Sequence, residues 1–500
     1  MAQYVLDSDF GEGGHVYVAE DSVTTVVHGL SLEGDAMLVL SQVGPVGTSV
    51  ADRDVLLSKF DSEGELDHSF GQGGQLRFDF DSLSYSTGIF LMEDIDGSFL
   101  VLGSGKTDSN SDRTWGCVQR VSADGTPLPL SAQLSALRYE VMGLEEYPNT
   151  LHRDAADRYL IAGSTFDPIG NHAQPVVLRY SANWAIDSSF GGTGKILFDF
   201  GATVALRGNA VHFSGGFIRD LMVLPDSGIA ICGALSNGNH YSGFIAGIRK
   251  DGMLETDFCP PYGYAEFDLF NGYDTRIKGM ALLPDGTLAF GGATHPSNPD
   301  AELLLGRLNP ANGSFTYEKI DLGDTQVEFD DLLLGADGGL RMLATGENTS
   351  TSSLALIHIP DPEHLQQHSI ARFTPDSSLS ISGNFMFAQS NRILFGGFQR
   401  TSSPPIRGFL SAVHVPLTFA PASVQSTTDF SIFPNPARDH FTIRSSESIR
   451  DVSLYTLHGK RCFTQTGGIG KETTIQLPFL PAGTYILSVN HQSRKKIILR

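Results

Sequence analysis

Short apolar stretches alternate with turn residues along most of the chain, and their spacing predicts β-strands. An apolar strand that ends in a small residue recurs seven times, at intervals of 52 to 70 residues. The seven copies are residues 38–41, 100–103, 160–163, 230–233, 289–292, 341–344 and 394–397. Several follow Asp-Gly turns, such as Asp285-Gly286, which supply the positive φ angles of tight hairpins. This pattern predicts a repetitive all-β fold.

Two further phrases complete the repeat. Another apolar strand follows each copy, at residues 55–60, 116–121, 176–180, 244–249, 303–308, 354–359 and 409–415. The phrase Leu-Asp-Ser-Asp-Phe-Gly at residues 6–11 returns at 66–71 and 186–191, and in a decayed form at 254–258. With the segments between these phrases, each unit holds about four short strands, which is typical of propeller blades and not of solenoids or helical repeats.

The repeat predicts a seven-bladed β-propeller over residues 1–417. We expect the chain to begin in the first strand of one unit and to stop after the fourth strand of the seventh. The N-terminal strand, near residues 15–20, is then expected to close the ring by pairing with the last blade. The Leu-Asp-x-Ser-Phe-Gly phrase resembles the delta-60 repeat family of bacterial propellers, and the resemblance covers roughly 400 residues. It implies a propeller fold and no particular activity.

The C-terminal part differs in composition and motifs. A linker rich in Pro, Ser, Thr and Ala is predicted at residues 418–429, followed at 430–500 by alternating strands that predict a small immunoglobulin-like β-sandwich. Four short motifs occur here in order: Pro434-Asn435-Pro436, then Gly459-Lys460 after a strand, then Leu480-Pro481-Ala482-Gly483 with Tyr485, and a terminal basic strand that contains Lys495 and Lys496.

This order of motifs resembles the type A sorting domain of the type IX (Por) secretion system of Bacteroidetes. The resemblance implies that the C-terminal domain engages the type IX secretion machinery as a partner. It also implies export to the cell surface or the medium and removal of the domain. An N-terminal signal peptide is accordingly expected to have preceded Ala2. An unrelated terminal adhesion sandwich is the alternative.

Charge narrows the classes of partner. The net charge is -22, and residues 430–500 hold ten Lys and Arg against four Asp and Glu. The remaining chain therefore carries 24 basic against 52 acidic residues. Such an acidic body disfavours nucleic acid as a partner. No apolar run reaches the roughly 18 residues of a membrane helix, so no integral membrane segment is predicted.

Motifs that could carry chemistry are few. The acids of the repeated phrase, Asp7, Asp67, Asp187 and Glu255, are interpreted as caps of their own turns, with a ring of cation ligands as the alternative. The turn Gly191-Gly192-Thr193-Gly194-Lys195 lacks the Ser or Thr and the helix of a phosphate-binding loop.

Histidines and cysteines give no clear site. His358, Glu363, His364 and His368 form the densest histidine cluster, and metal binding there would require a helical turn. The cysteines Cys117, Cys232, Cys259 and Cys462 form no C-x-x-C pair and are expected to be buried thiols, although a disulfide between Cys232 and Cys259 stays open.

No catalytic, cofactor-binding or metal-binding residue is assigned from the sequence, and no cofactor is expected. The leading hypothesis is a non-enzymatic surface module that binds a glycan or a protein. Its loops at residues 105–114, 166–174 and 237–241 are the most elaborate. The alternative is a secreted hydrolase of polysaccharide or peptide with acidic residues at the propeller channel. Perturbed carboxylates at the channel would favour that alternative.

Overall fold

The computed structural model describes residues 4–18, 23–33, 36–45, 53–107, 111, 113–141, 145–167, 172–198, 215–236, 240–269, 274–294, 301–348, 352–373, 380–389, 392–400, 406–415, 430–433, 437, 440–456, 461–476, 483–489 and 493–499. It divides into two compact units, Met1–Pro416 and Leu417–Arg500. The described residues are almost entirely β-strands and turns, so the all-β prediction is confirmed.

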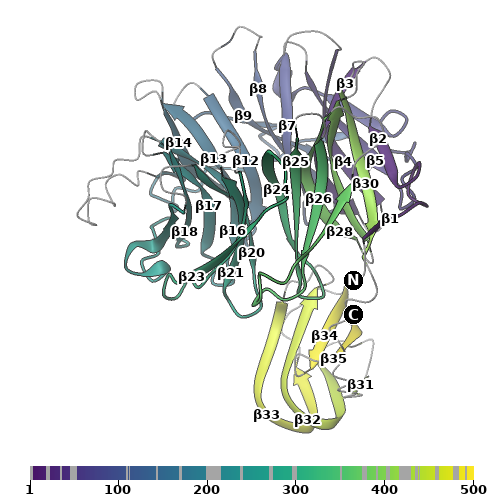
Figure 1. Ribbon diagram of the computed structural model, residues 1–500, viewed down its shortest axis with the longest axis vertical. Coiled ribbons are helices and arrows are strands. Elements are labelled where there is room, and N and C mark those ends of the chain that lie inside the picture. The colour runs from purple at the N-terminus through teal and green to yellow at the C-terminus, as the bar shows by residue number, and fades with distance from the viewer. Residues whose placement is uncertain are drawn as a thin grey trace. The chain divides into compact units, whose positions relative to one another are not determined.

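The described strands of the first unit form seven antiparallel sheets, which we call blades 1 to 7 (Figure 1). Blade 1 contains β3 (Val23–Glu33), β4 (Ala36–Pro45), β5 (Asp54–Phe60) and β6 (Gln75–Phe78). Blade 2 contains β7 (Tyr85–Glu93), β8 (Phe99–Lys106), β9 (Trp115–Val121), β10 (Pro127–Leu128) and β11 (Leu137–Tyr139). Blade 3 contains β12 (Glu145–Arg153), β13 (Tyr159–Asp167), β14 (His172–Tyr180) and β15 (Lys195–Leu197).

The other four blades follow the same plan. Blade 4 contains β16 (Gly215–Val223), β17 (Ile229–Ser236), β18 (Tyr241–Ile248) and β19 (Tyr264–Phe267). Blade 5 contains β20 (Thr275–Leu282), β21 (Leu288–Thr294), β22 (Leu303–Leu308) and β23 (Phe315–Ile320). Blade 6 contains β24 (Gln326–Leu334), β25 (Leu340–Glu347), β26 (Ser352–Ile359) and β27 (Ser369–Phe373). Blade 7 contains β28 (Ser380–Gln389), β29 (Arg392–Arg400) and β30 (Ile406–His414). Within the described residues, two short helical turns, η1 (Phe80–Ser82) and η3 (Cys259–Gly263), interrupt the connections.

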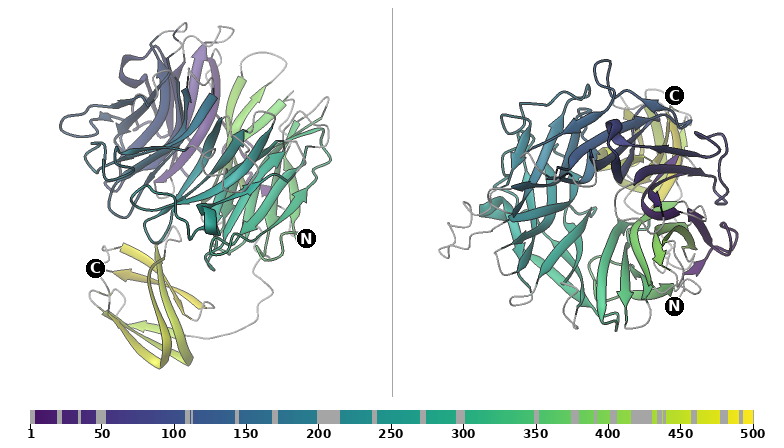
Figure 2. Two further views of the ribbon diagram at one scale, coloured as in Figure 1. Left: turned by 90° about the vertical axis from the view of Figure 1, so that its left-hand side faces the viewer. Right: turned by 90° about the horizontal axis from the view of Figure 1, so that it is seen from above.

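The first strand of each blade lies beside the propeller axis (Figure 2). Each of β3, β7, β12, β16, β20, β24 and β28 contacts the first strands of the two neighbouring blades, and β28 contacts β3. The β-propeller prediction is therefore confirmed. The core lies between neighbouring blades: Leu160 of blade 3 and Ile231 of blade 4 belong to one apolar cluster, and Ala289 of blade 5 and Met342 of blade 6 belong to another.

The N-terminal strands close the ring. Strand β1 (Val5–Leu6) and strand β2 (His15–Val18) both pair with β30, in registers that place Val5 opposite His414 and Val16 opposite Leu410. The expected closure is confirmed. The expected phase of the repeat is wrong, because β30 is the third strand of its blade and the N-terminal segment supplies the fourth. The Asp-x-Ser-Phe-Gly phrase thus lies between the third and fourth strands and does not open a blade.

The second unit contains five described strands in one sheet. These are β31 (Phe430–Phe433), β32 (His440–Thr456), β33 (Arg461–Gln476), β34 (Gly483–Val489) and β35 (Ser493–Leu499), in the order β31-β32-β34-β35 with β33 on β32. Its core includes Phe441, Ile443, Val452 and Leu487. The immunoglobulin-like sandwich stays a prediction, because β32 joins all of β31, β33 and β34 in one hydrogen-bonded sheet.

Candidate functional site

The acids of the repeated phrase cap their own turns, as the sequence indicates. In each case a carboxylate oxygen accepts a hydrogen bond from the backbone N–H two residues further on. The donor and acceptor pairs are Asp9 to Asp7 at 3.2 Å, Ser69 to Asp67 at 3.0 Å, Ser189 to Asp187 at 3.1 Å and Asp257 to Glu255 at 3.1 Å. These oxygens satisfy backbone donors, so the acids have a structural role.

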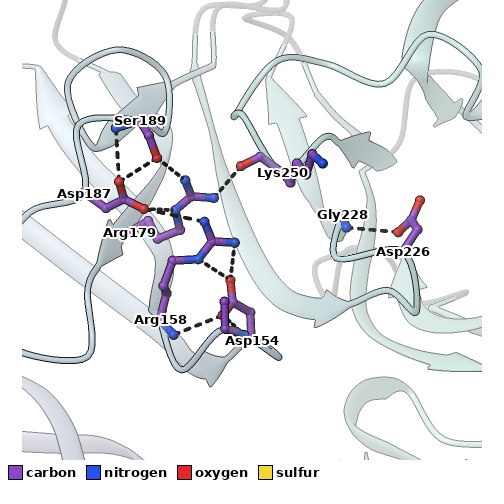
Figure 3. Close-up of polar contacts among 9 residues, drawn as sticks. Asp154, Arg158, Arg179, Asp187, Ser189, Asp226, Gly228 and Lys250 are labelled. Carbon is purple, nitrogen blue, oxygen red and sulfur yellow. Dashed lines mark hydrogen bonds and ion pairs between the residues drawn. The ribbon is translucent and has the colours of Figure 1, made fainter.

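The same acids join neighbouring blades, and Figure 3 shows this for Asp187. The Arg179 Nε atom donates to Asp187 at 2.8 Å, and the Arg179 guanidinium also donates to the carbonyl oxygen of Lys250 in the next blade. The hydroxyl of Ser189 holds the pKa of Asp187 below its usual range. A basic side chain thus binds both the acid of the repeated phrase and a backbone carbonyl of the next blade. We call this arrangement the interblade clamp.

The interblade clamp recurs in two other places. In blade 1, Lys59 lies 3.9 Å from Asp67 and donates to the carbonyl of Ala123 in blade 2 at 3.3 Å. In blade 7, Arg392 donates to Asp7 at 3.1 Å and to the carbonyl of Ser62 in blade 1 at 2.8 Å. The backbone completes the connection, because the N–H of Gly71 donates to the carbonyl of Asp124 at 2.8 Å. The repeated phrase therefore serves assembly of the ring.

The glycine-rich segment at residues 191–195 is a turn. Gly191, Gly192 and Gly194 have φ angles of 60°, 77° and 80°, and the hydroxyl of Thr193 donates to the carbonyl of Lys195 at 3.2 Å. Strand β15 follows directly, without a helix. The turn interpretation is confirmed.

The histidine cluster does not come together as a metal site. His358 is buried in β26 against Tyr4, with ring centroids 5.9 Å apart, and burial lowers its pKa to about 4. His364 pairs instead with Asp361 at 2.7 Å, on the surface. Residues 360–368 form turns and not a helix. Across the part of the chain that the structure describes, no group of His, Cys, Asp and Glu side chains could hold a metal ion.

Three cysteines are buried as free thiols. Burial raises the pKa of Cys117 and that of Cys259 to about 12, and it raises the pKa of Cys232 well above its usual range. Cys232 and Cys259 lie in one apolar cluster without a disulfide. They behave as small core residues.

Several positions from the sequence fall outside the described residues. These are parts of the loops at 105–114, 166–174 and 237–241, the linker at 418–429, and the sorting-motif residues Pro434, Asn435, Pro436, Gly459, Lys460, Leu480, Pro481 and Ala482. Gly483 and Tyr485 belong to β34, and Lys495 and Lys496 belong to β35.

The sequence analysis missed a second repeated feature, a β-bulge in every first strand. The pairing of the first and second strands skips one residue in each of the seven blades, in the same region of the strand. We call the seven skipped residues the bulge ring: His28, Ile89, Asn149, Arg219, Lys278, Asp330 and Asn384. Bulges re-aim side chains. Because the inner edge of a first strand has no paired strand, an exposed side chain in the middle of it reaches solvent at the axis.

Three members of the bulge ring bind the next blade. The amide of Asn149 donates to the carbonyl of Ile218 at 2.6 Å, and the amide of Asn384 donates to the carbonyl of Val27 at 2.6 Å. The ammonium of Lys278 donates to the carbonyl of Phe329 at 3.1 Å. Each acceptor is the residue directly before the bulge of the following blade. At these positions the side chain connects first strands around the axis.

The other four members, His28, Ile89, Arg219 and Asp330, make no such bond in the part of the chain that is described, and Arg219 is the positively charged one among them. Among the described residues, its guanidinium has no hydrogen-bond partner and no carboxylate within 4 Å. It lies over the ring of Phe217, with Cζ 4.6 Å from the ring centroid. The side chain is exposed, yet the surrounding protein desolvates it enough to lower its pKa, and the charge of Arg276 lowers that pKa further. Two guanidinium groups on neighbouring first strands thus lie close together.

Arg276 completes a basic and aromatic cluster with Arg219. Its Cζ atom lies 4.9 Å from the ring centroid of Tyr241 and 5.9 Å from that of Phe217. Its Nη2 atom donates to Asp274 at 2.9 Å, while its buried Nε atom has no partner among the described residues. We call Phe217, Arg219, Tyr241 and Arg276 the axial cluster.

Two acids beside the bulge ring connect blades. Asp331 accepts hydrogen bonds from the N–H groups of Leu332 and Met386, both at 2.7 Å, and Met386 belongs to the next blade. Asp220 makes the same bonds to Leu221 at 2.8 Å and to Met280 at 3.1 Å. Burial raises the pKa of Asp220 to about 6 and that of Asp331 to about 7.

In a second pair of acids, the pKa of Glu328 is lowered and the pKa of Asp330 is raised. Burial opposes ionisation of Glu328, but the ammonium of Lys278, at 2.6 Å, outweighs burial and lowers the pKa. Burial raises the pKa of Asp330 well above its usual range. The hydroxyl of Thr345 donates to Asp330 at 2.7 Å and accepts from the N–H of Gly383 at 3.0 Å.

One signal in the sequence could have revealed the bulges. A glycine stands directly beside the skipped residue in four of the seven first strands: Gly29, Gly88, Gly279 and Gly383. An isolated glycine in a strand pattern is a recognised sign of a bulge.

Two family models match parts of the chain. Residues 431–500 match a secretion system C-terminal sorting domain, and residues 156–190 match a β-propeller domain of unknown function. The chain thus combines a β-propeller with a type IX secretion sorting domain, which links it to the type IX machinery. The sorting domain indicates export to the cell surface or the extracellular space. Within the described residues, no helix is long and apolar enough to cross a membrane.

Several solved structures are similar to this chain at low sequence identity. PorZ, a surface component of the type IX secretion system of Porphyromonas gingivalis, has a TM-score of 0.38 and 12% identity, covering 94% of this chain. This chain spans 59% of that protein. The polysaccharide lyase Uly1 has a TM-score of 0.49 and 10% identity, covering 83% and 97% of the two chains. The β-propeller domain of a Pyrococcus furiosus protease has a TM-score of 0.39 and 8% identity, covering 78% and 95%. No curated protein matches the chain.

Proposed function

We propose that the exported propeller is a non-enzymatic binding module and that its ligand contacts the axial cluster. The observation that carries this proposal is the position of Arg219. In blades 3, 5 and 7 the bulge-ring residue holds the next blade, whereas Arg219 makes no such bond. A charged group that makes no hydrogen bond or ion pair within the ring, and that is held near a like charge, is a candidate for ligand recognition.

Neighbouring side chains support this assignment. Phe217 and Arg276 stand two residues before the bulge of their strands, and blade 7 has Ser382 and blade 1 has Val26 at the same position. The propeller therefore forms with small side chains there. Blades 2, 3 and 6 have Thr87, Tyr147 and Glu328 there. An aromatic side chain therefore stands beside a basic one at this position only on blades 4 and 5, which indicates a local purpose beyond the fold.

Thermal shift of the full chain against neutral and acidic polysaccharides and peptides tests the proposal. A ligand at a hundred times its dissociation constant should add about 2.7 kcal/mol to the free energy of unfolding. Phe217→Ala should remove that shift, and Ser382→Ala, at the equivalent position of blade 7, should leave it unchanged. If no ligand gives a shift that depends on Phe217, the axial cluster is not a binding site.

A second candidate function, hydrolysis, is favoured by Glu328 and Asp330. Two acids whose environments drive their pKa values apart match the ionised and protonated partners of a glycosidase. The packing of Asp330 argues for a structural role instead, because a Cβ added to Gly383 would lie only 2.5 Å from its Oδ2 atom. Release of reducing sugar from a bound polysaccharide, abolished by Glu328→Gln and by Asp330→Asn, would establish hydrolysis.

A further inference from the structure

Arg219 differs from the other basic groups around it in making no ion pair within 4 Å in the described ranges, although the charge of Glu328 attracts it from further away. Nearby cations are paired: Arg276 donates to Asp274 at 2.9 Å, and Lys278 donates to Glu328 at 2.6 Å. For Arg219, no carboxylate among the described residues lies within 4 Å. Charge that is partly removed from water and left unpaired is costly. An anionic group on a ligand would supply the missing partner.

The aromatic rings fix where that anion would be held. The centroids of Phe217 and Tyr241 lie 5.4 Å apart, at an angle of 49° between the rings. Arg219 lies over the first ring and Arg276 lies nearest the second. Stacking on an aromatic face orients a planar guanidinium while leaving its N–H edge free, and that edge matches two oxygens of a carboxylate or sulfate. The cluster is therefore prepared to accept an oxyanion.

We infer that the axial cluster binds an acidic polysaccharide, with Arg219 paired to a carboxylate or sulfate group of a sugar unit. The inference rests on the proposed binding function and specifies its ligand. Other side chains two residues before the bulge carry hydroxyl groups, namely Thr87, Tyr147 and Ser382. Sugar hydroxyls hydrogen-bond to such groups. An acidic peptide also presents carboxylates that arginines recognise, and it is therefore the competing ligand in the test.

The net negative charge of the protein bears on how an acidic ligand could bind. An overall charge of -22 repels polyanions at long range. Binding of an acidic chain therefore requires a local cation that has no internal partner, and Arg219 is one. This predicts an affinity that falls when Arg219 is neutralised, although removal of a positive charge elsewhere has little effect.

Isothermal titration of the full chain tests the inference with four probes. Polygalacturonate carries carboxylates, a sulfated galactan carries sulfates, dextran is a neutral polysaccharide and poly-glutamate is an acidic peptide. We expect binding of polygalacturonate or the sulfated galactan, and the two arms identify the anion. Arg219→Ala should weaken this binding at least about tenfold, and higher salt should weaken it in the unaltered protein.

Controls separate the binding role of Arg219 from folding and from net charge. Arg249→Ala removes the same charge from an exposed pair with Asp251 and should leave the affinity unchanged. Arg219→Ala should melt no lower than the unaltered protein in the absence of ligand.

Three results would overturn the inference. They are equal binding of polyanion by Arg219→Ala, binding of poly-glutamate in preference to both acidic polysaccharides, and no binding of either acidic polysaccharide. Dextran binding that is lost in Phe217→Ala would keep the proposed function while refuting the acidic ligand.

Discussion

Arg392 donates a hydrogen bond of 3.1 Å to Asp7, a residue 385 positions earlier in the chain. Both side chains are largely buried, and His414 also lies 3.2 Å from the same carboxylate. This contact connects the closing segment to the last blade, while the Arg392 guanidinium also reaches Ser62 of the first. One arginine therefore joins three parts of the chain at the seam of the ring.

Removal of this arginine should weaken the seam. We expect Arg392→Ala to lower the free energy of unfolding by about 2 kcal/mol, because Asp7 loses a charged partner in a poorly solvated position. Chemical denaturation measures the change. Arg77→Ala, which removes an exposed pair with Asp54, serves as the control and should cost less than about 1 kcal/mol. Equal losses in both variants would contradict a special role for the seam.

Two glycines of one turn should respond differently to alanine. Gly71 and Gly73 have φ angles of 54° and 66°, which disfavour other residues at both positions. A Cβ on Gly71 would lie 2.2 Å from the carbonyl oxygen of Gln75, whereas a Cβ on Gly73 meets nothing within 4 Å. Gly73→Ala should cost about 1 kcal/mol, and Gly71→Ala clearly more. Melting temperatures of the two variants decide the point, and equal shifts would exclude the clash as the cause.

Substitutions in the bulge ring should affect stability differently, depending on whether the residue binds the next blade. Asn149→Ala removes the bond to the Ile218 carbonyl and should cost about 1–2 kcal/mol. Arg219→Ala removes no hydrogen bond. It loses the contact with Phe217 but relieves the desolvation of the charge and the repulsion from Arg276, so its stability should equal or exceed that of the unaltered protein. Denaturation of the two variants side by side checks this. A loss in Arg219→Ala as large as that in Asn149→Ala would show that Arg219 also supports the ring.

The effect of Asp331→Asn on stability should depend on pH. Burial raises the pKa of Asp331 to about 7 in the folded protein, above the value near 3.9 of an unfolded aspartate. Between these values the folded state binds more protons than the unfolded state, so the contribution of Asp331 to stability is lost as pH rises. Asparagine does not titrate. From about pH 4.5 to about pH 8, the melting temperature of the variant should therefore gain about 2–4 °C relative to the unaltered protein.

For Asp67→Asn, the stability of the variant relative to the unaltered protein should fall as pH rises, which is the opposite trend. The hydroxyl of Ser69 lowers the pKa of Asp67, so the folded state binds fewer protons near that pKa and the unaltered protein gains stability over the variant as pH rises through it. Differential scanning calorimetry across pH measures both differences. The same trend in both variants would contradict the assigned directions.

Export should require the C-terminal domain. In its host, a chain that lacks residues 431–500 should stay inside the cell envelope, because this segment is the match to the sorting domain. Immunoblots of cell, surface and medium fractions report the location. A passenger protein fused to residues 417–500 should gain export in the same host. Appearance of the truncated chain outside the cell would contradict the assignment.

Repetition made the architecture predictable. Phe70 and Gly71 belong to a phrase that returns three times, so its turn role could be recognised without the fold, and Asp67 was interpreted correctly as a cap. The phase of the blades could not be obtained this way. Repeat boundaries are arbitrary along a chain, and only the pairing of β2 with β30 shows which strand is borrowed.

The axial cluster was beyond prediction for a different reason. The bulge at Arg219 is one skipped residue in the pairing of β16 with β17. A single skipped residue leaves no signal in the spacing of apolar and polar positions. Whether an arginine is paired depends on which carbonyls and carboxylates other blades bring near it. Asn149 and Arg219 occupy equivalent positions, and only the three-dimensional arrangement distinguishes the one that binds a carbonyl from the one that does not.

The pairing of Val5 with His414 joins the two ends of the propeller sequence, and this bears on how the ring folds. Joining two points 409 residues apart costs about 5 kcal/mol of loop-closure entropy. Seven sheets formed from local hairpins can assemble early, but this last pairing must wait until nearly the whole propeller sequence is available. The ring should thus fold in a late, slow step, and a chain that is still being delivered across a membrane presents an open row of blades with an unpaired edge at β30.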